Sequence, residues 1–252
     1  MDLDYKIVIE KPEFEEYNKH VDSKKILILP FVNQGLVASR NWIWDHAQKN
    51  GFEKYWTLDD NIREVYRLNR NRRIRVGSGV VFKILEDFGA RFLNMPILGM
   101  HYKMFAPRGL NKPPFITNTR VYSNMLITTD YKDRYGLPYR FRDFYNDDTD
   151  LCLRMLKDGN CLIQTYAFLI DKSTTMKVKG GNTGCYQDDG RYKMALSLRN
   201  QHPDVTAIVE RYGRWQHFVN YDRFRNNKLM RSSVAIANGI NEYGLKLKPR
   251  KK

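Results

Sequence analysis

Three consecutive polar residues could hold a metal ion. Asp59-Asp60-Asn61 directly follows the apolar residues 55–58, Tyr-Trp-Thr-Leu. Two carboxylates and an amide supply the hard oxygen ligands that Mg²⁺ or Mn²⁺ prefers. The same residue types also favour turns. Their place after a predicted buried strand favours a ligand site, because ligands of α/β sheets bind beyond the carboxyl ends of the strands.

A second acidic cluster opens a predicted amphipathic helix. It comprises four acids, Asp143, Asp147, Asp148 and Asp150. Acids at a helix start can serve only to balance the helix dipole. Carboxylates this close repel one another unless a cation or a catalytic role offsets the repulsion. One of them could therefore act as a general base that deprotonates an acceptor hydroxyl.

A glycine-rich segment lies further along the chain, at residues 177–184 (Lys-Val-Lys-Gly-Gly-Asn-Thr-Gly). Glycines allow the backbone to approach a phosphate closely. Its central residues Lys179, Gly180 and Gly181 are therefore candidate contacts for the phosphates of a bound nucleotide. The segment matches no established nucleotide-binding fingerprint, so an ordinary surface loop is an equal alternative.

The charge of the chain favours a polyanionic partner. Lys and Arg total 43 against 28 Asp and Glu, which gives a net charge of +15. A charged run is often only a solvated face, but arginines interleaved with aromatic residues suit a phosphate backbone and an unstacked base. The predicted nucleic-acid contacts are Arg63, Arg67, Arg70, Arg72, Arg73, Arg75, Arg214, Arg223 and Arg225.

The elements that must position these residues alternate between strand and helix. Apolar runs predict strands, and apolar residues at helical spacing predict helices. The expected strands are Lys6–Ile9, Lys25–Phe31, Tyr55–Leu58, Tyr122–Thr128 and Cys161–Tyr166, and the expected helices are Ser39–Asn50, Val80–Leu93 and Asp147–Lys157. This alternation predicts an α/β fold with a mainly parallel central sheet and helices on both faces.

The length of 252 residues suits one catalytic domain, residues 1–210, and a basic C-terminal extension, residues 211–252, expected to be helical and then flexible. No run approaches the roughly 20 apolar residues that span a bilayer. The acidic start of the chain differs from a signal peptide, and the odd number of cysteines fits reduced thiols. We therefore expect a cytoplasmic protein with no membrane partner.

Two segments resemble the TET-associated glycosyltransferase family, found mainly in bacteriophages. They are residues 39–44 (Ser-Arg-Asn-Trp-Ile-Trp) and residues 55–62 (Tyr-Trp-Thr-Leu-Asp-Asp-Asn-Ile). The resemblance spans roughly residues 5–190. It implies a GT-A fold, which is Rossmann-like, with a divalent metal and a nucleoside-diphosphate sugar donor that is UDP-linked.

The resemblance also assigns residues to roles. Residues 147–154 (Asp-Asp-Thr-Asp-Leu-Cys-Leu-Arg) are similar to the Glu-Asp-x-Asp-Leu-x-x-Arg stretch of inverting GT-A enzymes, whose catalytic base maps to Asp148. The metal would rest on residues of Asp59, Asp60 and Asn61. Because Asn61 stands where the family motif ends in aspartate, the ligands are either Asp59 and Asp60, or Asp60 with a water-bridged Asn61. Implied donor contacts are Arg40, Asn41, Asp59, Lys179, Gly180 and Gly181.

The acceptor that the family resemblance implies is a 5-hydroxymethylpyrimidine in DNA, in the cytoplasm of an infected host. Its base would be flipped out of the duplex for reaction. Three alternatives remain open from the sequence. The acceptor could be a protein or a small molecule, the two acidic clusters could form a metal-dependent nuclease, or the chain could be a DNA-binding module without catalysis.

Overall fold

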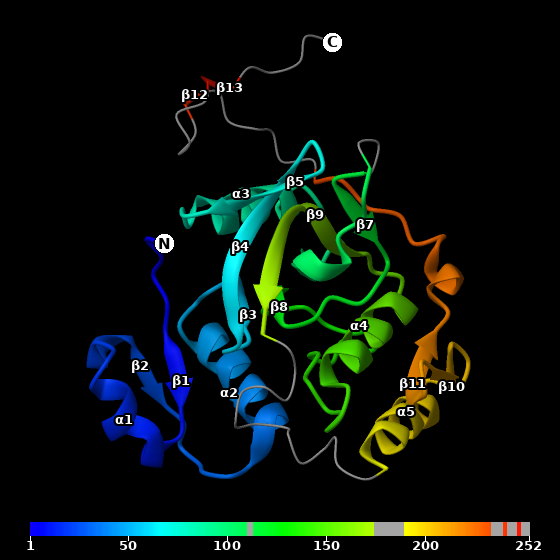
Figure 1. Ribbon diagram of the computed structural model, residues 1–252, viewed down its shortest axis with the longest axis horizontal. Coiled ribbons are helices and arrows are strands. Elements are labelled where there is room, and N and C mark those ends of the chain that lie inside the picture. Colours follow the sequence, from blue (N-terminus) through cyan, green and yellow to red (C-terminus); the bar gives the residue numbers. More distant parts are fainter. Residues whose placement is uncertain (110–112, 174–188, 233–238, 241–245, 248–252) are drawn as a thin grey trace.

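The computed structural model describes residues 1–109, 113–173, 189–232, 239–240 and 246–247 (Figure 1). Its centre is a seven-stranded sheet in the order β3–β8–β6–β9–β4–β5, with β7 paired to β9. The strands are β3 (Lys54–Leu58), β4 (Ile62–Asn69), β5 (Arg72–Val76), β6 (Ile97–Tyr102), β7 (Phe115–Thr117), β8 (Asn124–Thr128) and β9 (Leu162–Lys172). β7 lies beside the first half of β9 and β4 beside the second half.

The central sheet is mixed, so the expectation of a mainly parallel sheet is wrong. Among its described strands only β6 and β9 pair in parallel. The strands β3, β6 and β9 finish at the end of the sheet that carries Asp59, whereas β4 and β8 begin there. Since only residues 59–61 join β3 to β4, the chain must turn at this Asp59 end and run back.

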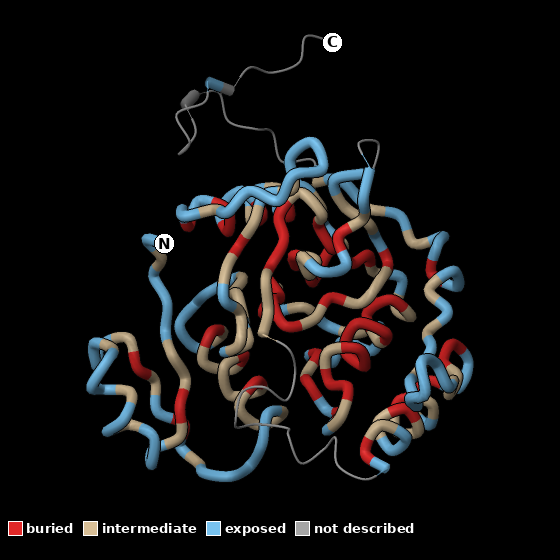
Figure 2. Tube along the Cα trace, viewed as in Figure 1, coloured by how far each residue is buried: buried red, intermediate tan, exposed pale blue. Residues whose placement is uncertain are grey.

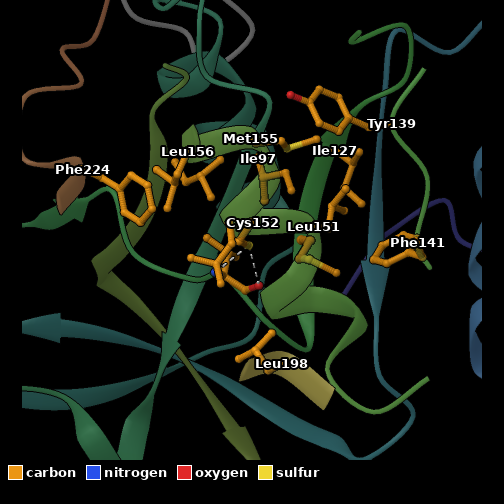
Figure 3. Packing of buried hydrophobic residues seen from close by; sticks show 14 of the residues in the cluster. Ile97, Ile127, Tyr139, Phe141, Leu151, Cys152, Met155, Leu156, Leu198 and Phe224 are labelled. Atoms are coloured by element: carbon orange, nitrogen blue, oxygen red, sulfur yellow. Dashed lines mark hydrogen bonds between the residues drawn. The ribbon is translucent and has the colours of Figure 1, made fainter. Parts of the chain in front are cut away.

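Helices cover both faces of the sheet, as expected. Successive strand residues point to opposite faces, so Ile97 and Leu98 enter different hydrophobic clusters. One cluster packs against α2 (Gly35–Lys49) and α4 (Asp147–Lys157), and the other against α3 (Val80–Gly89). Figure 3 shows the first cluster, in which α4 contributes Leu151, Cys152, Met155 and Leu156. This packing fixes the start of α4 relative to the sheet.

Smaller units flank the central layers (Figure 1). On one side β1 (Ile7–Ile9) and β2 (Ile26–Ile28) form a parallel pair beside α1 (Phe14–Asn18). On the other, α5 (Gly190–Gln201) lies against the hairpin of β10 (Thr206–Arg211) and β11 (Arg214–Val219). Short 3-10 helices are η1 (Lys11–Glu13), η2 (Ser23–Lys25), η3 (Lys103–Phe105) and η5 (Tyr221–Phe224), and β12 (Gly239–Ile240) pairs with β13 (Lys246–Leu247).

Several sequence expectations differ from these elements. The strand expected at 25–31 is shorter and lies outside the central sheet, because its only strand partner among the described residues is β1. The division at residue 210 falls within the β10–β11 hairpin, and the extension expected to be helical begins with β11 and η5. No helix among the described residues is long and apolar enough to cross a bilayer. Figure 2 shows burial concentrated in the central sheet and α4.

Gly99 permits the close approach of β6 and β8. A Cβ on this residue would lie 2.3 Å from both the Asn124 carbonyl oxygen and the Val121 Cγ1. The Asn124 side chain occupies the neighbouring space, where its Oδ1 accepts from the Met100 N–H at 2.6 Å and its Nδ2 donates to the Met100 carbonyl at 3.0 Å. The pairing at this point therefore depends on a missing side chain.

We expect Gly99→Ala to lower the free energy of unfolding by about 1–3 kcal/mol, because backbone atoms would have to move apart. Chemical denaturation measures the change. Gly77→Ala is the matched control, since a Cβ there meets no atom within 4 Å. Equal stabilities for the two variants would contradict this account of the β6–β8 contact.

Candidate active site

A buried arginine joins the two acidic motifs. Arg40 on α2 is 6% exposed. Its Nη2 donates to Asp59 Oδ1 at 3.0 Å, and its Nη1 donates to Asp147 Oδ2. Burial opposes the charge of this guanidinium, but Asp147 and Asp59 outweigh it and raise its pKa. The end of β3 and the start of α4, far apart in the sequence, therefore meet through one cation.

Lys172, the last residue of β9, completes the surroundings of Asp59. Its Nζ donates to Asp59 Oδ2 and to Ser123 Oγ, both at 2.7 Å. Ser123 Oγ also shares a hydrogen bond of 2.5 Å with the Tyr102 hydroxyl. Burial alone would raise the pKa of Asp59, yet Arg40 and Lys172 hold it below its usual value. Asp59 is thus ionised and has a cation on each carboxylate oxygen.

The three predicted metal ligands have different surroundings. The described residues contain no group of three or more His, Cys, Asp or Glu side chains placed to hold a metal ion, and the predicted set has only two such residues beside Asn61. A cation at Asp59 would share its carboxylate oxygens with Arg40 and Lys172. Asp60 is exposed. The pKa of Tyr17 on α1 is raised by burial first, and then by the charges of Glu13 and Asp60. Asn61 Oδ1 is buried and has no hydrogen-bond partner among the described residues.

The three acids that open α4 have different surroundings. Burial raises the pKa of Asp147 to about 6 against the opposing effect of Arg40, and the neighbouring Asp148 adds to the increase. Asp148 is partly exposed, and its Oδ1 accepts from the backbone N–H of Thr149 at 2.6 Å. Asp148 is therefore the acid of this segment that remains accessible to a bound molecule.

Asp150 belongs to the interior. It is fully buried, and it accepts hydrogen bonds from Arg142 and Arg154 and pairs with His202 Nε2 at 2.9 Å. Burial by itself would raise its pKa, but His202, Arg142 and Arg154 lower it to about 2. This carboxylate ties α4 to the loop before it and to the end of α5, which is a structural role.

A second group of polar residues lies near Asp148. Arg120 donates from Nη1 to His217 Nε2 at 3.0 Å, and its guanidinium lies 4.7 Å from the centre of the Tyr122 ring. Burial raises the pKa of Tyr221 and lowers that of His217. Burial also opposes the charge of Arg120, but the neighbouring tyrosines and Asp148 outweigh it and raise the pKa of Arg120. The charge of Asp148 acts on all three residues and on Arg40, so Asp148 lies near both the Asp59 group and the Arg120 group.

The predicted donor residues are only partly brought together. Arg40 and Asp59 meet, but Asn41 has both ends of its amide bonded to the Phe141 backbone, at 2.8 and 2.9 Å. Asn41 thus fastens α2 to the segment before α4. Lys179, Gly180 and Gly181 lie outside the described residues.

The predicted nucleic-acid arginines fall into two separate groups, and all of them are exposed. Six lie on the β4–β5 hairpin, where Arg63 pairs with Asp171 at 3.4 Å and Arg75 with Glu64 at 2.8 Å. The others lie on β11 and around η5. Figure 1 shows β5 near the top of the molecule and β11 well apart from it at the lower right, so the arginines do not form one continuous patch.

Sequence reasoning missed several residues of this site. No sequence motif points to Lys172, Ser123, Tyr102, Arg120 or His217. The apolar run of residues 168–170 extends the strand predicted at 161–166, and following it would have led to Lys172. Only the sheet order brings Ser123 and Tyr102 to Asp59.

Two substitutions should separate the structural acid from the accessible one. We expect Asp150→Asn to lower the free energy of unfolding by about 3–5 kcal/mol, because it removes the charge of a fully buried carboxylate that Arg142, Arg154 and His202 share. Asp148→Asn, at a partly exposed position, should change it by less than about 0.5 kcal/mol. Denaturant unfolding at neutral pH measures both changes.

The stability of the fold should depend on pH through the ionisation of Asp150. The pKa of Asp150 in the folded state is about 2, below the ordinary value of 3.8. Ionised Asp150 therefore stabilises the fold at pH values above about 3.8. The contribution is lost as the pH falls through about 2. Asp150→Asn should therefore flatten the acid limb of the stability curve, and an unchanged limb would contradict the assignment.

Comparison with known proteins bears on this arrangement. The family model described as TET-Associated Glycosyltransferase matches residues 1–181, a range that contains Arg40, Asp59, Asp148 and Lys172. It ends before α5 and the β10–β11 hairpin. The chain has no significant match among curated proteins or solved structures. The match confirms the resemblance and covers most of the sequence, so the chain belongs to the TET-associated glycosyltransferase family.

Proposed function

We propose that this glycosyltransferase moves a sugar from a nucleoside-diphosphate donor, UDP-linked, to the hydroxymethyl group of a 5-hydroxymethylpyrimidine in DNA. The observation that carries the proposal is the bridge from Asp59 through Arg40 to Asp147. It brings the two motifs on which the family resemblance rests to one place, with Asp148 accessible beside it.

The donor diphosphate is assigned to the Asp59 end of the sheet. An ammonium group has three N–H donors, and Lys172 uses two of them on Asp59 and Ser123. Its third N–H has no hydrogen-bond partner among the described residues. A diphosphate oxygen could accept from it, and the positive charge would stabilise the negative charge that develops on the leaving group.

Asp148 is the general base of the proposed reaction. Its carboxylate removes the proton of the acceptor hydroxyl, whose oxygen attacks the anomeric carbon of the sugar. The bond from that carbon to the diphosphate oxygen breaks, and its electron pair leaves with the nucleoside diphosphate. Attack from the face opposite the leaving group inverts the configuration at the anomeric carbon.

A divalent metal is not assigned a step in this proposal. The family resemblance implies one at Asp59, Asp60 and Asn61, but both oxygens of Asp59 already bind cationic side chains. A metal bound there with the donor would lie close to the positive charges of Arg40 and Lys172.

The test is sugar transfer itself. Incubation with hydroxymethylated DNA and a panel of nucleotide sugars, in Mn²⁺ and in EDTA, is followed by mass spectrometry of the digested nucleosides. We expect one donor to add a sugar-sized mass. Asp148→Asn should slow transfer by about 10²–10⁴-fold, the usual contribution of a general base. Absence of a mass increase with every donor would overturn the proposal.

The basic hairpin gives a second prediction. The tip of this hairpin and the Asp59 end of the sheet are separated by the whole length of β4. That distance is roughly 25 Å at the usual rise per strand residue. We therefore expect Arg70→Ala/Arg72→Ala/Arg73→Ala to weaken binding to long duplex DNA but not to a short oligonucleotide. The slope of log K against log salt should become shallower by about 0.9 for each DNA phosphate that the variant no longer neutralises.

The matched control is Lys11→Ala/Lys19→Ala/Lys24→Ala, which removes the same charge from exposed positions near the N-terminus. Fluorescence anisotropy at several salt concentrations measures both variants. If the two variants weaken long-duplex binding equally, the hairpin has no specific part in DNA binding and only net charge matters.

A further inference from the structure

A cavity beside the candidate active site has no part in the donor chemistry described above. It lies between α5 and β11, and its volume is about 420 Å³. This is within the range of about 300–1,000 Å³ typical of small-molecule sites. Its walls combine basic residues with aromatic ones, and they include Arg120, Trp215, His217 and Tyr221.

Two residues that line the cavity, Arg120 and His217, lie near enough to Asp148 for its charge to act on their pKa values. Arg120 and His217 face each other there at 3.0 Å. A guanidinium can only donate, so His217 Nε2 accepts and the ring carries its hydrogen on Nδ1. Burial, with the positive charge of Arg120, lowers the pKa of His217 to about 4, which keeps the ring neutral at physiological pH. The wall is therefore positive at Arg120 and neutral at His217.

Tyr221 also lines this wall. Its hydroxyl has no exposed surface, so another part of the residue meets the cavity. Arg120 is partly exposed and lines the cavity, so it offers N–H donors to a bound molecule that has a polar edge.

The outer part of the cavity suits a flat ring and a backbone that carries phosphates. Trp215 is 45% exposed, and its ring packs edge to face on Tyr192 at a centroid distance of 5.5 Å. A partly exposed indole held in place in this way offers a stacking surface. Arg191 and Arg214 also line the cavity and could contact flanking phosphates.

The cavity also differs from the donor side in its relation to the family. Donor-side residues Arg40, Asp59 and Lys172 lie within the matched range 1–181, whereas the walls from α5 and β11 lie beyond it. The part of the site outside the shared range is the natural place for a feature that selects the acceptor of this chain.

We propose that this cavity receives a single extruded pyrimidine base, stacked on Trp215, with its polar edge toward Arg120 and its 5-substituent directed to Asp148. The inference rests on the proposed function, since it names the place of the acceptor in the same reaction. Direct readout of a flipped base by stacking and by hydrogen bonds to its edge is a known solution for enzymes that modify bases.

The experiment measures binding of a short single-stranded oligonucleotide that contains one 5-hydroxymethylcytosine or 5-hydroxymethyluracil, by fluorescence anisotropy, and binding of UDP, by calorimetry. Trp215→Ala should weaken oligonucleotide binding by about tenfold or more, the usual effect of losing one base stack, and leave UDP binding unchanged. Trp215→Phe should restore most of the affinity. Tyr212→Asn is the control, because it removes a fully exposed aromatic residue from the same hairpin at a positive-φ position that asparagine tolerates.

Each outcome decides the matter. Unchanged oligonucleotide affinity in Trp215→Ala would overturn the inference, and so would equal losses in Trp215→Ala and Tyr212→Asn. Loss of UDP affinity instead would assign the cavity to the donor. Because binding is measured without turnover, these results are independent of whether sugar transfer is detected, and failure of transfer alone would count against the proposed function and not the cavity.

Discussion

The arrangement of this site depends on one buried cation. Arg40 lies between Asp59, at the end of β3, and Asp147, at the start of α4. Two carboxylates in a poorly solvated place would repel each other, and a guanidinium that forms directed hydrogen bonds to both removes the repulsion. Breaking such a buried group is strongly unfavourable, because it leaves uncompensated charge. The relative position of the two motifs is therefore fixed before any substrate binds.

The sheet explains why these groups meet. Strands β3, β6 and β9 finish at the Asp59 end, and β8 begins there, so the residues at their ends converge without being close in sequence. Lys172 and Ser123 reach Asp59 in this way. Asp148 also lies near Arg120 and His217, which line the cavity between α5 and β11. The accessible acid is thus near both a cationic group and a cavity with aromatic and polar walls.

Patterns of consecutive residues predicted the helices and strands whose formation depends on those same residues. The Asp147–Lys157 helix was predicted with the bounds that the structure has, because its apolar stripe and acidic start are consecutive features of the sequence. The helix containing Arg40 and the strand before Asp59 were also predicted, with shifted bounds. The alternation around residues 62–76 was interpreted only as an arginine cluster, and the β4–β5 hairpin was missed. The direction of the strands, and hence the mixed sheet, depends on which strand ends lie together, and no single segment carries that information.

The same distinction applies to the candidate site. Asp59 and Asp148 could be singled out because acids in unusual clusters are visible in a sequence. The strand that ends at Lys172 can be followed in the sequence, but its pairing with Asp59 cannot, because it depends on the sheet order. Asp150 and Asp148 are distinguished only by their burial and their partners. The most direct test of the account is a crystal structure with UDP and an oligonucleotide that contains a 5-hydroxymethylpyrimidine. The account predicts the hydroxymethyl oxygen within about 2.6–3.2 Å of the Asp148 carboxylate, with the diphosphate at Lys172. A hydroxymethyl group positioned at another acid, or a diphosphate bound away from Lys172, would contradict it.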